Sequence, residues 1–244
     1  MFDVPDQRAA VSAAQLLRPT RFPFVSALFG KAIGLSYRLT GKHPYDNFRL
    51  ERVQGLSILV TPSVLNPKLT RSGAFFASRL DARIVTGDTQ VLDMGTGSGV
   101  CALAAARYAR RVVGVDISAA AVRCARINAM LNHLDHKIEL HHGDLFEPVA
   151  AERFDLVLFN PPFLHGTPRD DRDRAWRSND VAERFTASLA NHLKPNGSAL
   201  VLLSTFGGSQ RFLDEFRKHR FDISVLDTRR FINERLAIFR LRPP

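Results

Sequence analysis

From Gly87 onward, the chain alternates short apolar runs with longer stretches whose apolar residues recur at helical spacing. Short apolar runs bounded by turn residues are typical of buried strands, and the stretches between them are long enough for helices. Strands alternating with helices predict an α/β fold, with a mostly parallel sheet and helices on both faces. We expect strands at 91–94, 111–115, 137–141, 154–159 and 198–204, and helices at 100–108, 119–131, 181–192 and 210–218.

The two ends of this alternation differ from its middle. The last apolar runs, at 221–226 and 236–241, are separated by an arginine-rich turn at 227–234. Two strands joined in this way predict a hairpin, which gives an otherwise parallel sheet an antiparallel last strand. Before the alternation, we expect a strand at 56–61 and a helix at 72–80.

The first 50 residues form a basic segment in which aromatic side chains are interleaved with arginines and lysines. Such a mixture can bind nucleic acid, because bases stack on rings and phosphates pair with cations. Apolar residues also recur at helical spacing between Val25 and Leu35, which favours a helical segment that packs on the main domain. We therefore divide the chain into a basic N-terminal helical segment, 1–50, and a main domain, 51–244.

Composition limits the classes of partner and compartment. The chain has 34 Lys and Arg against 24 Asp and Glu, a formal net charge of +10, which favours approach to RNA, DNA or the ribosome. Its two cysteines, Cys101 and Cys124, have no zinc-site spacing, so we expect reduced thiols, no metal and a cytoplasmic protein. No apolar run reaches the roughly 20 residues that span a bilayer, so no membrane partner is expected.

A glycine-rich loop, Asp93-Met94-Gly95-Thr96-Gly97-Ser98-Gly99, joins an expected strand to an expected helix. Ligands bind beyond the carboxyl ends of strands in open α/β sheets, and glycines there let the backbone approach the ligand. The spacing is G-x-G-x-G, whereas the dinucleotide pattern is G-x-G-x-x-G. The Asp93 carboxylate would repel a pyrophosphate but attract the ammonium group of a methionine moiety. The loop therefore favours S-adenosylmethionine over NAD.

Two more acids follow the next two strands. Asp116 ends the strand at 111–115, where a carboxylate can accept hydrogen bonds from both hydroxyls of a ribose. Asp144 follows the strand at 137–141 and could accept from an adenine amino group, with Leu145 packed on the purine. Asp144 taken alone would be interpreted as an ordinary turn residue, but three acids after three successive strands favour one cofactor site.

The segment Asn160-Pro161-Pro162-Phe163 follows the apolar strand at 154–159. Two prolines remove two backbone donors and leave carbonyl groups free to accept hydrogen bonds. A planar nitrogen is a poor nucleophile, and hydrogen bonds from its N–H groups to Asn160 and to the Pro161 carbonyl would help to localise its lone pair. Phe163 offers a flat face for a planar substrate. The alternative is a rigid loop with a buried asparagine.

These motifs resemble the HemK-type glutamine methyltransferases that modify release factors, and the wider small-domain nitrogen methyltransferases that act on bases in RNA or DNA. The similarity covers roughly residues 54–205, and the segments 93–99, 115–118, 143–146 and 160–163 stand in the families' order. It implies a Rossmann-like seven-stranded methyltransferase sheet and S-adenosylmethionine as cofactor. It also implies the roles of Asp93, Gly95, Gly97, Asp116, Asp144 and Asn160. Together with the arguments from the residues, the candidate catalytic residues are Asn160, Pro161 and Phe163, and the candidate cofactor-binding residues are Asp93, Gly95, Thr96, Gly97, Asp116, Ile117, Asp144, Leu145 and Asn160.

The chain also departs from the release-factor enzymes, which usually carry tyrosine in place of Phe163. The loop Leu164-His165-Gly166-Thr167 is closer to the rRNA guanine methyltransferases, and residues 1–50 do not match the release-factor enzymes' helical domain. Residues 60–78 resemble the segment that closes over the cofactor in this group, with Pro67, Thr70 and Ser72 as candidates.

The resulting hypothesis is an N-methyltransferase whose acceptor is a nucleobase in RNA or DNA, a protein glutamine on a ribosome-associated partner, or a small metabolite. A non-catalytic RNA-binding module that retains the cofactor pocket is the alternative of another class, and an NAD-dependent reductase is a more distant one. Weaker candidates are His165 beside the substrate, a lid with Arg169, Arg172, Arg174, Trp176 and Arg177, strand-end histidines His141 and His142, and a basic surface with Arg229, Arg230, Arg235, Arg240 and Arg242.

Overall fold

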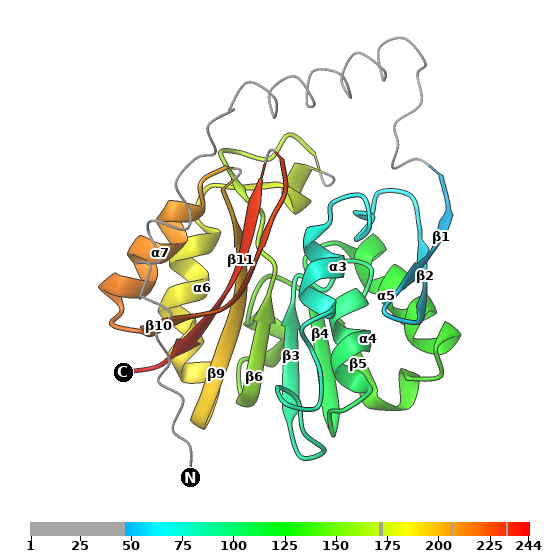
Figure 1. Ribbon diagram of the computed structural model, residues 1–244, viewed down its shortest axis with the longest axis horizontal. Helices are drawn as coiled ribbons and strands as arrows, with labels where there is room; N and C mark the ends of the chain where they lie inside the picture. The colour runs from blue at the N-terminus through cyan, green and yellow to red at the C-terminus, as the bar shows by residue number, and fades with distance from the viewer. Residues whose placement is uncertain (1–46, 171–172, 206, 233) are drawn as a thin grey trace, which may run out of the picture.

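The computed structural model describes residues 47–170, 173–205, 207–232 and 234–244 (Figure 1). The N-terminal helical segment expected over 1–50 therefore lies, up to residue 46, outside the described residues. The first described strand, β1, spans Arg49–Val53. The division of the chain at residue 50 remains a prediction.

A seven-stranded sheet forms the centre of the molecule, in the order β10-β11-β9-β6-β3-β4-β5. Neighbouring strands from β9 to β5 run parallel, whereas β11 is antiparallel to both β9 and β10. The expected mostly parallel Rossmann-like sheet with an antiparallel last strand is confirmed. The strands are β3 Gln90–Met94, β4 Arg111–Asp116, β5 Ile138–His142, β6 Phe154–Phe159, β9 Leu193–Ser204, β10 Asp222–Arg230 and β11 Arg235–Arg242.

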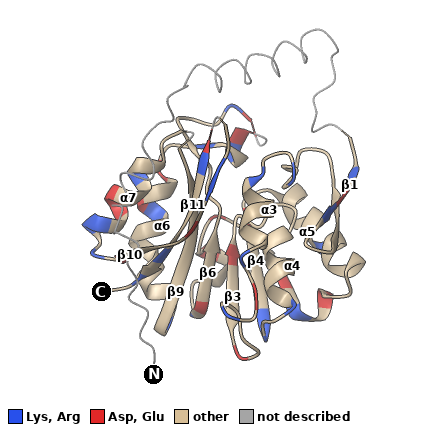
Figure 2. Cartoon of the chain, viewed as in Figure 1, with Lys and Arg blue, Asp and Glu red and all other residues tan. Residues whose placement is uncertain are grey.

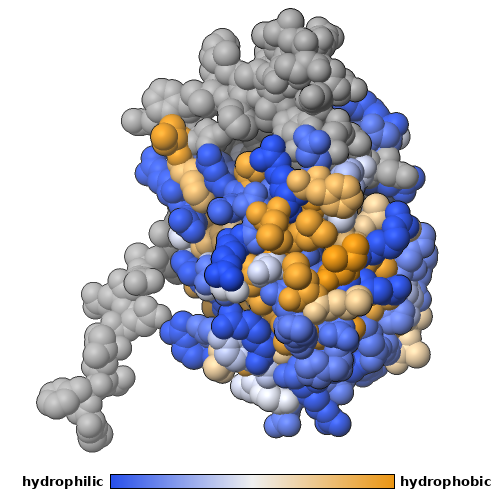
Figure 3. All heavy atoms as spheres, turned by 90° about the vertical axis from the view of Figure 1, so that its right-hand side faces the viewer, coloured by the Kyte–Doolittle hydropathy of each residue, from blue (hydrophilic) through white to orange (hydrophobic). Residues whose placement is uncertain are grey.

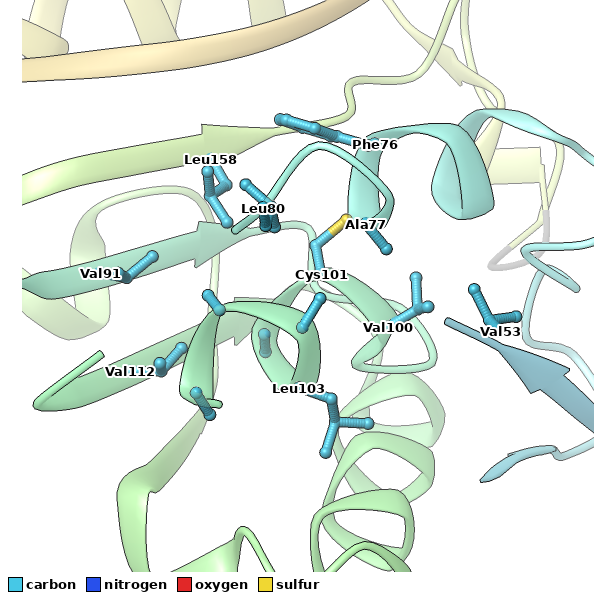
Figure 4. Close-up of a cluster of buried hydrophobic side chains, with 14 of the residues drawn as sticks. Val53, Phe76, Ala77, Leu80, Val91, Val100, Cys101, Leu103, Val112 and Leu158 are labelled. Atoms are coloured by element: carbon cyan, nitrogen blue, oxygen red, sulfur yellow. The ribbon is translucent and has the colours of Figure 1, made fainter. Parts of the chain in front are cut away.

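Helices cover both faces of this sheet, because successive strand residues point to opposite sides. Val91 on β3 packs into the core beneath α3 (Ser72–Ala77), α4 (Val100–Ala106) and α5 (Ala119–Leu131). Its neighbour Leu92 faces the second core, beneath α6 (Val181–Leu189) and α7 (Ser209–Lys218). Figure 4 shows the first core, where Phe76 of α3 and Leu103 of α4 lie with Val91 and Leu158. The central strands are buried on both faces, which explains their continuous apolar runs.

Element bounds differ from the expected ones mainly at segment ends. The helix expected over 181–192 stops at Leu189, and a 3-10 turn, Ala190–His192, leads into a β9 that starts five residues before the expected 198. The β10–β11 hairpin is longer than expected, since β10 continues to Arg230 and leaves only 231–234 as the turn. The remaining short elements are β7 Leu164–His165, β8 Arg177–Ser178 and the 3-10 turns Asp135–Lys137, Glu147–Val149 and Asp173–Ala175.

A separate hairpin of β1 and β2 (Leu56–Val60) is attached to α5 through two asparagine side chains. Asn128 accepts a hydrogen bond from the Leu59 backbone N–H at 2.7 Å and donates to the Leu59 carbonyl at 2.8 Å. Asn132 makes the same pair of bonds to Ser57, at 2.9 and 2.8 Å. These amides satisfy the backbone groups that a neighbouring strand would bind, and so they fix the hairpin from which residues 61–71 run toward the sheet.

The hairpin side of the molecule exposes several large apolar side chains (Figure 3). Phe48 and Leu50 are 67% and 69% exposed, and Met130 on α5 is 60% exposed. In the part of the chain that the structure describes, no helix is long and apolar enough to cross a lipid bilayer.

Candidate functional site

A cavity of about 460 Å³ opens at the carboxyl ends of the parallel strands. In an open α/β sheet this edge is where ligands bind. Its walls come from segments far apart in the sequence: residues 63–73, the loops after β3, β4 and β5, the turn after β6, and the segment 174–184. Every residue that the sequence predicted for catalysis or cofactor binding contributes to these walls.

The glycine-rich loop turns sharply between β3 and α4. Gly95, Gly97 and Gly99 have φ angles of 66°, 57° and 80°, in the left-handed region that a side chain disfavours. The Thr96 backbone N–H donates to the Val115 carbonyl at 3.0 Å, which ties the loop to the end of β4. The three glycines therefore allow the backbone itself to form one wall of the cavity.

Asp93, at the end of β3, is buried beneath this loop. One of its oxygens, Oδ2, accepts hydrogen bonds from the Thr96 hydroxyl at 2.7 Å and from the Ala102 backbone N–H at 2.9 Å. Burial raises the pKa of this carboxyl to about 7, although both hydrogen bonds oppose the shift. Asp93 thus gains a proton near neutral pH, and a cation in the cavity would favour its ionised form.

Asp116 ends β4 and holds the loop from the other side. Its two oxygens accept from the Gly97 N–H at 2.8 Å and from the Ser118 N–H at 2.9 Å. Burial raises the pKa of Asp116, and the two backbone bonds oppose the shift. Each oxygen has a second lone pair, so the carboxylate is oriented by the backbone and can still accept from hydroxyl groups of a ligand. Ile117, which follows it, is 40% exposed and also lines the cavity.

Asp144 lies past β5 and pairs with a residue that sequence reasoning missed. The Arg184 guanidinium, on α6, donates to Asp144 Oδ2 at 2.6 Å. Arg184 itself lines the cavity, as does Leu145, whose φ of 46° turns the backbone sharply after Asp144. No sequence motif indicates Arg184, because it lies 40 residues from Asp144 in the sequence. It lies on the polar side of α6, a helix that packs on one face of the sheet.

Asn160, at the end of β6, is oriented by Ser72. Its Nδ2 donates to the Ser72 hydroxyl at 3.2 Å across 88 residues of sequence. The other amide atom, Oδ1, is buried and has no hydrogen-bond partner among the described residues. A buried acceptor without a partner is costly unless a ligand satisfies it. Asn160 therefore presents an acceptor that is suited to an N–H group in the cavity.

The turn that carries Asn160 is supported from behind by the segment after β9. The Gly208 N–H donates to the Phe163 carbonyl at 2.7 Å. Gly207 has a φ of 92°, and a Cβ at this position would collide with the same carbonyl oxygen. The Phe163 ring is only 8% exposed: it lines the cavity but packs mostly into the core, so it presents less surface than a free stacking platform.

The segment 164–178 forms one side of the cavity. Its ends pair as the two short parallel strands β7 and β8, and the Leu164 N–H donates to the Trp176 carbonyl at 2.7 Å. Asp173 pairs with Arg169 and Arg177, each at 3.2 Å, and its pKa is lowered chiefly by the hydrogen bond from Arg169. Arg174, Trp176 and Arg177 line the cavity, whereas Arg172 lies outside the described residues. The function of this segment as a lid remains a prediction.

Comparison with known proteins identifies the family. The family model for the methyltransferase small domain matches residues 64–224, which is more than half of the chain. The chain belongs to the methyltransferase small domain family. It is a class I S-adenosylmethionine-dependent methyltransferase of the HemK-type group, as its sequence motifs predicted.

Curated relatives of this methyltransferase differ in the acceptor that their names give. The chain is 30% identical over 183 residues to a putative protein N5-glutamine methyltransferase of Methanocaldococcus jannaschii, covering 71% of this chain and 88% of the relative. It is 34% identical over 152 residues to a ribosomal RNA small subunit methyltransferase C of Alcanivorax borkumensis, covering 62% of this chain but only 43% of the relative.

A solved structure supports the fold. The 16S rRNA N2 G1207 methyltransferase of T. thermophilus, in complex with AdoMet and guanosine, matches with a TM-score of 0.59 and 23% identity. The match covers 81% of this chain and 50% of that one, so this methyltransferase spans about half the length of that rRNA enzyme.

S-adenosylmethionine fits the residues that line the cavity. The left-handed glycine loop leaves space where a Cβ would otherwise project, and beside it Asp93 offers a buried carboxylate and Asp116 a half-buried one. Asp144 and Leu145 line the same wall farther along. Of the weaker candidates in residues 60–78, Pro67, Thr70 and Ser72 also line the cavity.

The remaining histidine candidates lie outside the main cavity. His165 contacts Arg211, which also pairs with Glu183, and it lines a small separate pocket. His142 Nε2 lies 3.0 Å from the Ile117 carbonyl oxygen, and His141 lies 3.9 Å from Glu139. Across the described residues, no group of three or more His, Cys, Asp or Glu side chains is placed to hold a metal ion.

Proposed function

We propose that this methyltransferase transfers the methyl group of S-adenosylmethionine to a planar nitrogen, and that Asn160 orients that nitrogen. The observation that carries the proposal is the buried Asn160 Oδ1, which has no partner among the described residues and belongs to a residue that lines the cavity. Bound S-adenosylmethionine supplies an electrophilic methyl group, and the protein's task is to position the acceptor.

The catalytic turn accepts hydrogen bonds and donates few. Asn160 Oδ1 accepts a hydrogen bond from one N–H of the acceptor, and the Pro161 carbonyl accepts one from the other N–H. Pro161 and Pro162 have no backbone N–H, so no donor of theirs competes for these oxygens. Two hydrogen bonds to the N–H groups help to localise the nitrogen lone pair, and the released proton passes to water. Ser72 keeps Nδ2 occupied, which leaves Oδ1 for the acceptor.

The three acids at the ends of β3, β4 and β5 bind the cofactor in this proposal. In this proposal Asp93 binds the methionine ammonium, Asp116 binds the ribose hydroxyls and Asp144 binds the adenine amino group, with Leu145 and Ile117 on the adenine faces. Arg184 already occupies Asp144 Oδ2, so it directs the second oxygen toward the adenine. Gly95, Thr96 and Gly97 bring backbone groups within reach of the methionine moiety.

The acceptor that we favour is an exocyclic amino group of a nucleobase in RNA. Trp176 is a flat side chain that lines the cavity, and the small exposed part of Phe163 lines it too, which suits a planar ring. The formal net charge of +10 suits a polyanion. The similarity to rRNA methyltransferases supports this choice, and a ribosomal or tRNA substrate would place the activity in the cytoplasm. A protein glutamine is the second candidate, because the M. jannaschii relative named for that activity matches 71% of this chain.

To test this, the full chain is incubated with methyl-tritiated S-adenosylmethionine and total cell extract, and the labelled products are then digested with nuclease or with protease. We expect label that nuclease releases as a methylated base. Release by protease alone would identify a protein acceptor. Label resistant to both would show a metabolite acceptor, and no label, with S-adenosylhomocysteine binding intact, would favour a non-catalytic module. Either of these last two outcomes would overturn the proposal.

A further inference from the structure

The β10–β11 hairpin ends in a tip that combines positive charge with apolar surface. Arg229 and Arg230 end β10, and Phe231 and Ile232 follow in the turn. Arg71, immediately before α3, lies against the same turn. We call these five residues the hairpin-tip surface.

Two guanidinium groups lie close to one aromatic ring on this surface. The Arg71 guanidinium carbon is 4.9 Å from the centre of the Phe231 ring, and that of Arg229 is 5.4 Å away. Both distances are within the range of cation–π attraction. Arg71, Arg229 and Arg230 are all exposed, and Ile232 is 88% exposed, the highest fraction among the exposed large hydrophobic residues. The fold thus holds the ring and two cations together at the surface.

The charges of this surface are not neutralised by the fold. Arg71, Arg229 and Arg230 have no acidic side chain within 4.0 Å in the described part of the chain, whereas nearby arginines do. Arg79 pairs with Asp227, Arg177 with Asp173 and Arg184 with Asp144.

The acid in the same turn, Glu234, interacts electrostatically with Arg71 but forms no ion pair with it within 4.0 Å. Its carboxylate accepts a hydrogen bond from the Ser204 hydroxyl. Burial raises the pKa of Glu234, and the hydrogen bond from Ser204 and then the charge of Arg71 oppose the shift.

The surface lies beside the mouth of the cavity. Arg71 stands between Thr70 and Ser72, which both line the cavity, and its φ of 63° is unusual for a residue with a side chain. The backbone of β11 is joined to the residue after β9 by a hydrogen bond from the Thr205 N–H to the Arg235 carbonyl at 2.9 Å. Figure 2 shows Lys and Arg at the tip of this hairpin and before α3.

We propose that the hairpin-tip surface binds the sugar–phosphate backbone of a single-stranded RNA segment next to the acceptor base. Guanidinium groups pair with phosphates through two parallel hydrogen bonds, and Ile232 and the Phe231 edge provide apolar contact for an unstacked base. This proposal rests on the proposed function, since it supplies the contacts that bring an RNA acceptor to Asn160.

Charge removal at the tip tests this proposal. The double variant R229Q/R230Q of the full chain is compared with the wild type for binding a short fluorescein-labelled single-stranded RNA of mixed sequence. We expect affinity to fall at least about tenfold at low salt, and the slope of log affinity against log salt to decrease by about 1.4 for two lost phosphate contacts. Arg71→Gln, on a different element, should weaken binding in the same direction.

The matched control removes two exposed arginines from α5. R123Q/R126Q makes the same change in net charge, away from the cavity, and should alter RNA affinity by less than about twofold. S-adenosylhomocysteine affinity, measured by calorimetry, should be unchanged in both double variants, which shows that the fold is intact.

Equal losses of RNA affinity in the two double variants would contradict the proposed RNA-binding surface. An unchanged RNA affinity in R229Q/R230Q, or failure of the wild type to bind RNA, would also contradict it. The proposed function fails separately: if no nucleobase is methylated while R229Q/R230Q still weakens RNA binding selectively, the surface stands and the acceptor assignment falls.

Discussion

At the scale of single residues, the polar groups of the cavity are held in place by the chain itself. Asp116 is fixed by two backbone N–H groups, Asp93 by Thr96 and Ala102, and Asn160 by Ser72. Each side chain is therefore oriented before any ligand binds, which reduces the reorganisation that binding requires.

We expect the proposed contact between Asp93 and the methionine ammonium to make cofactor binding depend on pH. Its pKa of about 7 means that the free protein holds it mostly protonated at pH 6 and mostly ionised at pH 8. The methionine ammonium favours the ionised form, so affinity for S-adenosylhomocysteine should rise about tenfold between pH 6 and pH 8. Calorimetry in buffers of different ionisation heat should show proton release on binding at pH 6.

The stability of the free protein should change with pH in the opposite direction to its ligand affinity. A carboxyl whose pKa is raised on folding stabilises the free protein fully below its unfolded pKa of about 3.9, and this contribution is lost as pH rises through about 7. Asp93→Asn can keep the bonds from Thr96 and Ala102. It should bind the ligand more weakly, and with no pH dependence over this range. A pH dependence that persists in this variant would assign it to another group.

The candidate site was predictable at residues that follow strand ends. Asp93 and Asp116 lie in the last two residues of β3 and β4, Asn160 directly follows β6, and Asp144 comes two residues after β5. Parallel strands bring their carboxyl ends to one edge of the sheet. Ser72 and Arg184 were not predictable as partners, because each acts through a contact between segments 88 and 40 residues apart. Nothing in their local sequence indicates the residue they face.

At the scale of elements, the catalytic turn depends on close packing by the segment after β9. Gly207→Ala would place a methyl group on the Phe163 carbonyl and displace the turn that carries Asn160. We expect turnover with the identified acceptor to fall between about tenfold and a hundredfold, because small misplacements of reacting groups are costly. S-adenosylhomocysteine affinity should stay within about twofold, since the glycine loop is not touched.

Gly55→Ala is the matched control for backbone strain. Gly55 also has a positive φ, 80°, but no atom lies within 4 Å of an added Cβ. It should retain the wild-type turnover. If both variants lose turnover alike, strain alone accounts for the effect and the packing explanation is wrong.

The attachment of β2 to α5 should be measurable as stability. Asn128 is fully buried and bonds the Leu59 N–H, the Leu59 carbonyl and the Ser98 carbonyl. Asn128→Ala removes these three hydrogen bonds, and the free energy of unfolding should fall by about 2–4 kcal/mol in urea titration. Asn132→Ala, at a half-buried position, should lose only about 1 kcal/mol. A loss at Asn128 no larger than that at Asn132 would contradict this account.

Elements with strong patterns were predicted well. The bounds of α5 and β6 match the expected 119–131 and 154–159, because a long helical period and a continuous apolar run leave little ambiguity. β1 was not expected, since Arg49, Glu51 and Arg52 disguise a strand that pairs only with β2. The early start of β9 was missed because Pro195 and Gly197 are typical of turns.

At the scale of the whole molecule, the cavity joins both halves of the sheet. It is lined by residues 63–73 and by segments from 93 to 184, so a ligand there contacts much of the fold. S-adenosylhomocysteine at a hundred times its dissociation constant should stabilise the protein by about 2.7 kcal/mol, which raises Tm by about 5–10 °C. NAD at the same concentration should leave Tm unchanged in differential scanning fluorimetry. A comparable rise in Tm with NAD would instead indicate that the glycine loop binds a dinucleotide.

The central claim is that Asn160 Oδ1 holds the acceptor nitrogen. The most direct test is single-turnover methyl transfer by Asn160→Ala, with the acceptor that labelling identifies and with S-adenosylhomocysteine affinity measured in parallel. The account predicts a rate at least about a hundredfold lower, with cofactor affinity within about threefold of wild type. Transfer at the wild-type rate by this variant would contradict it.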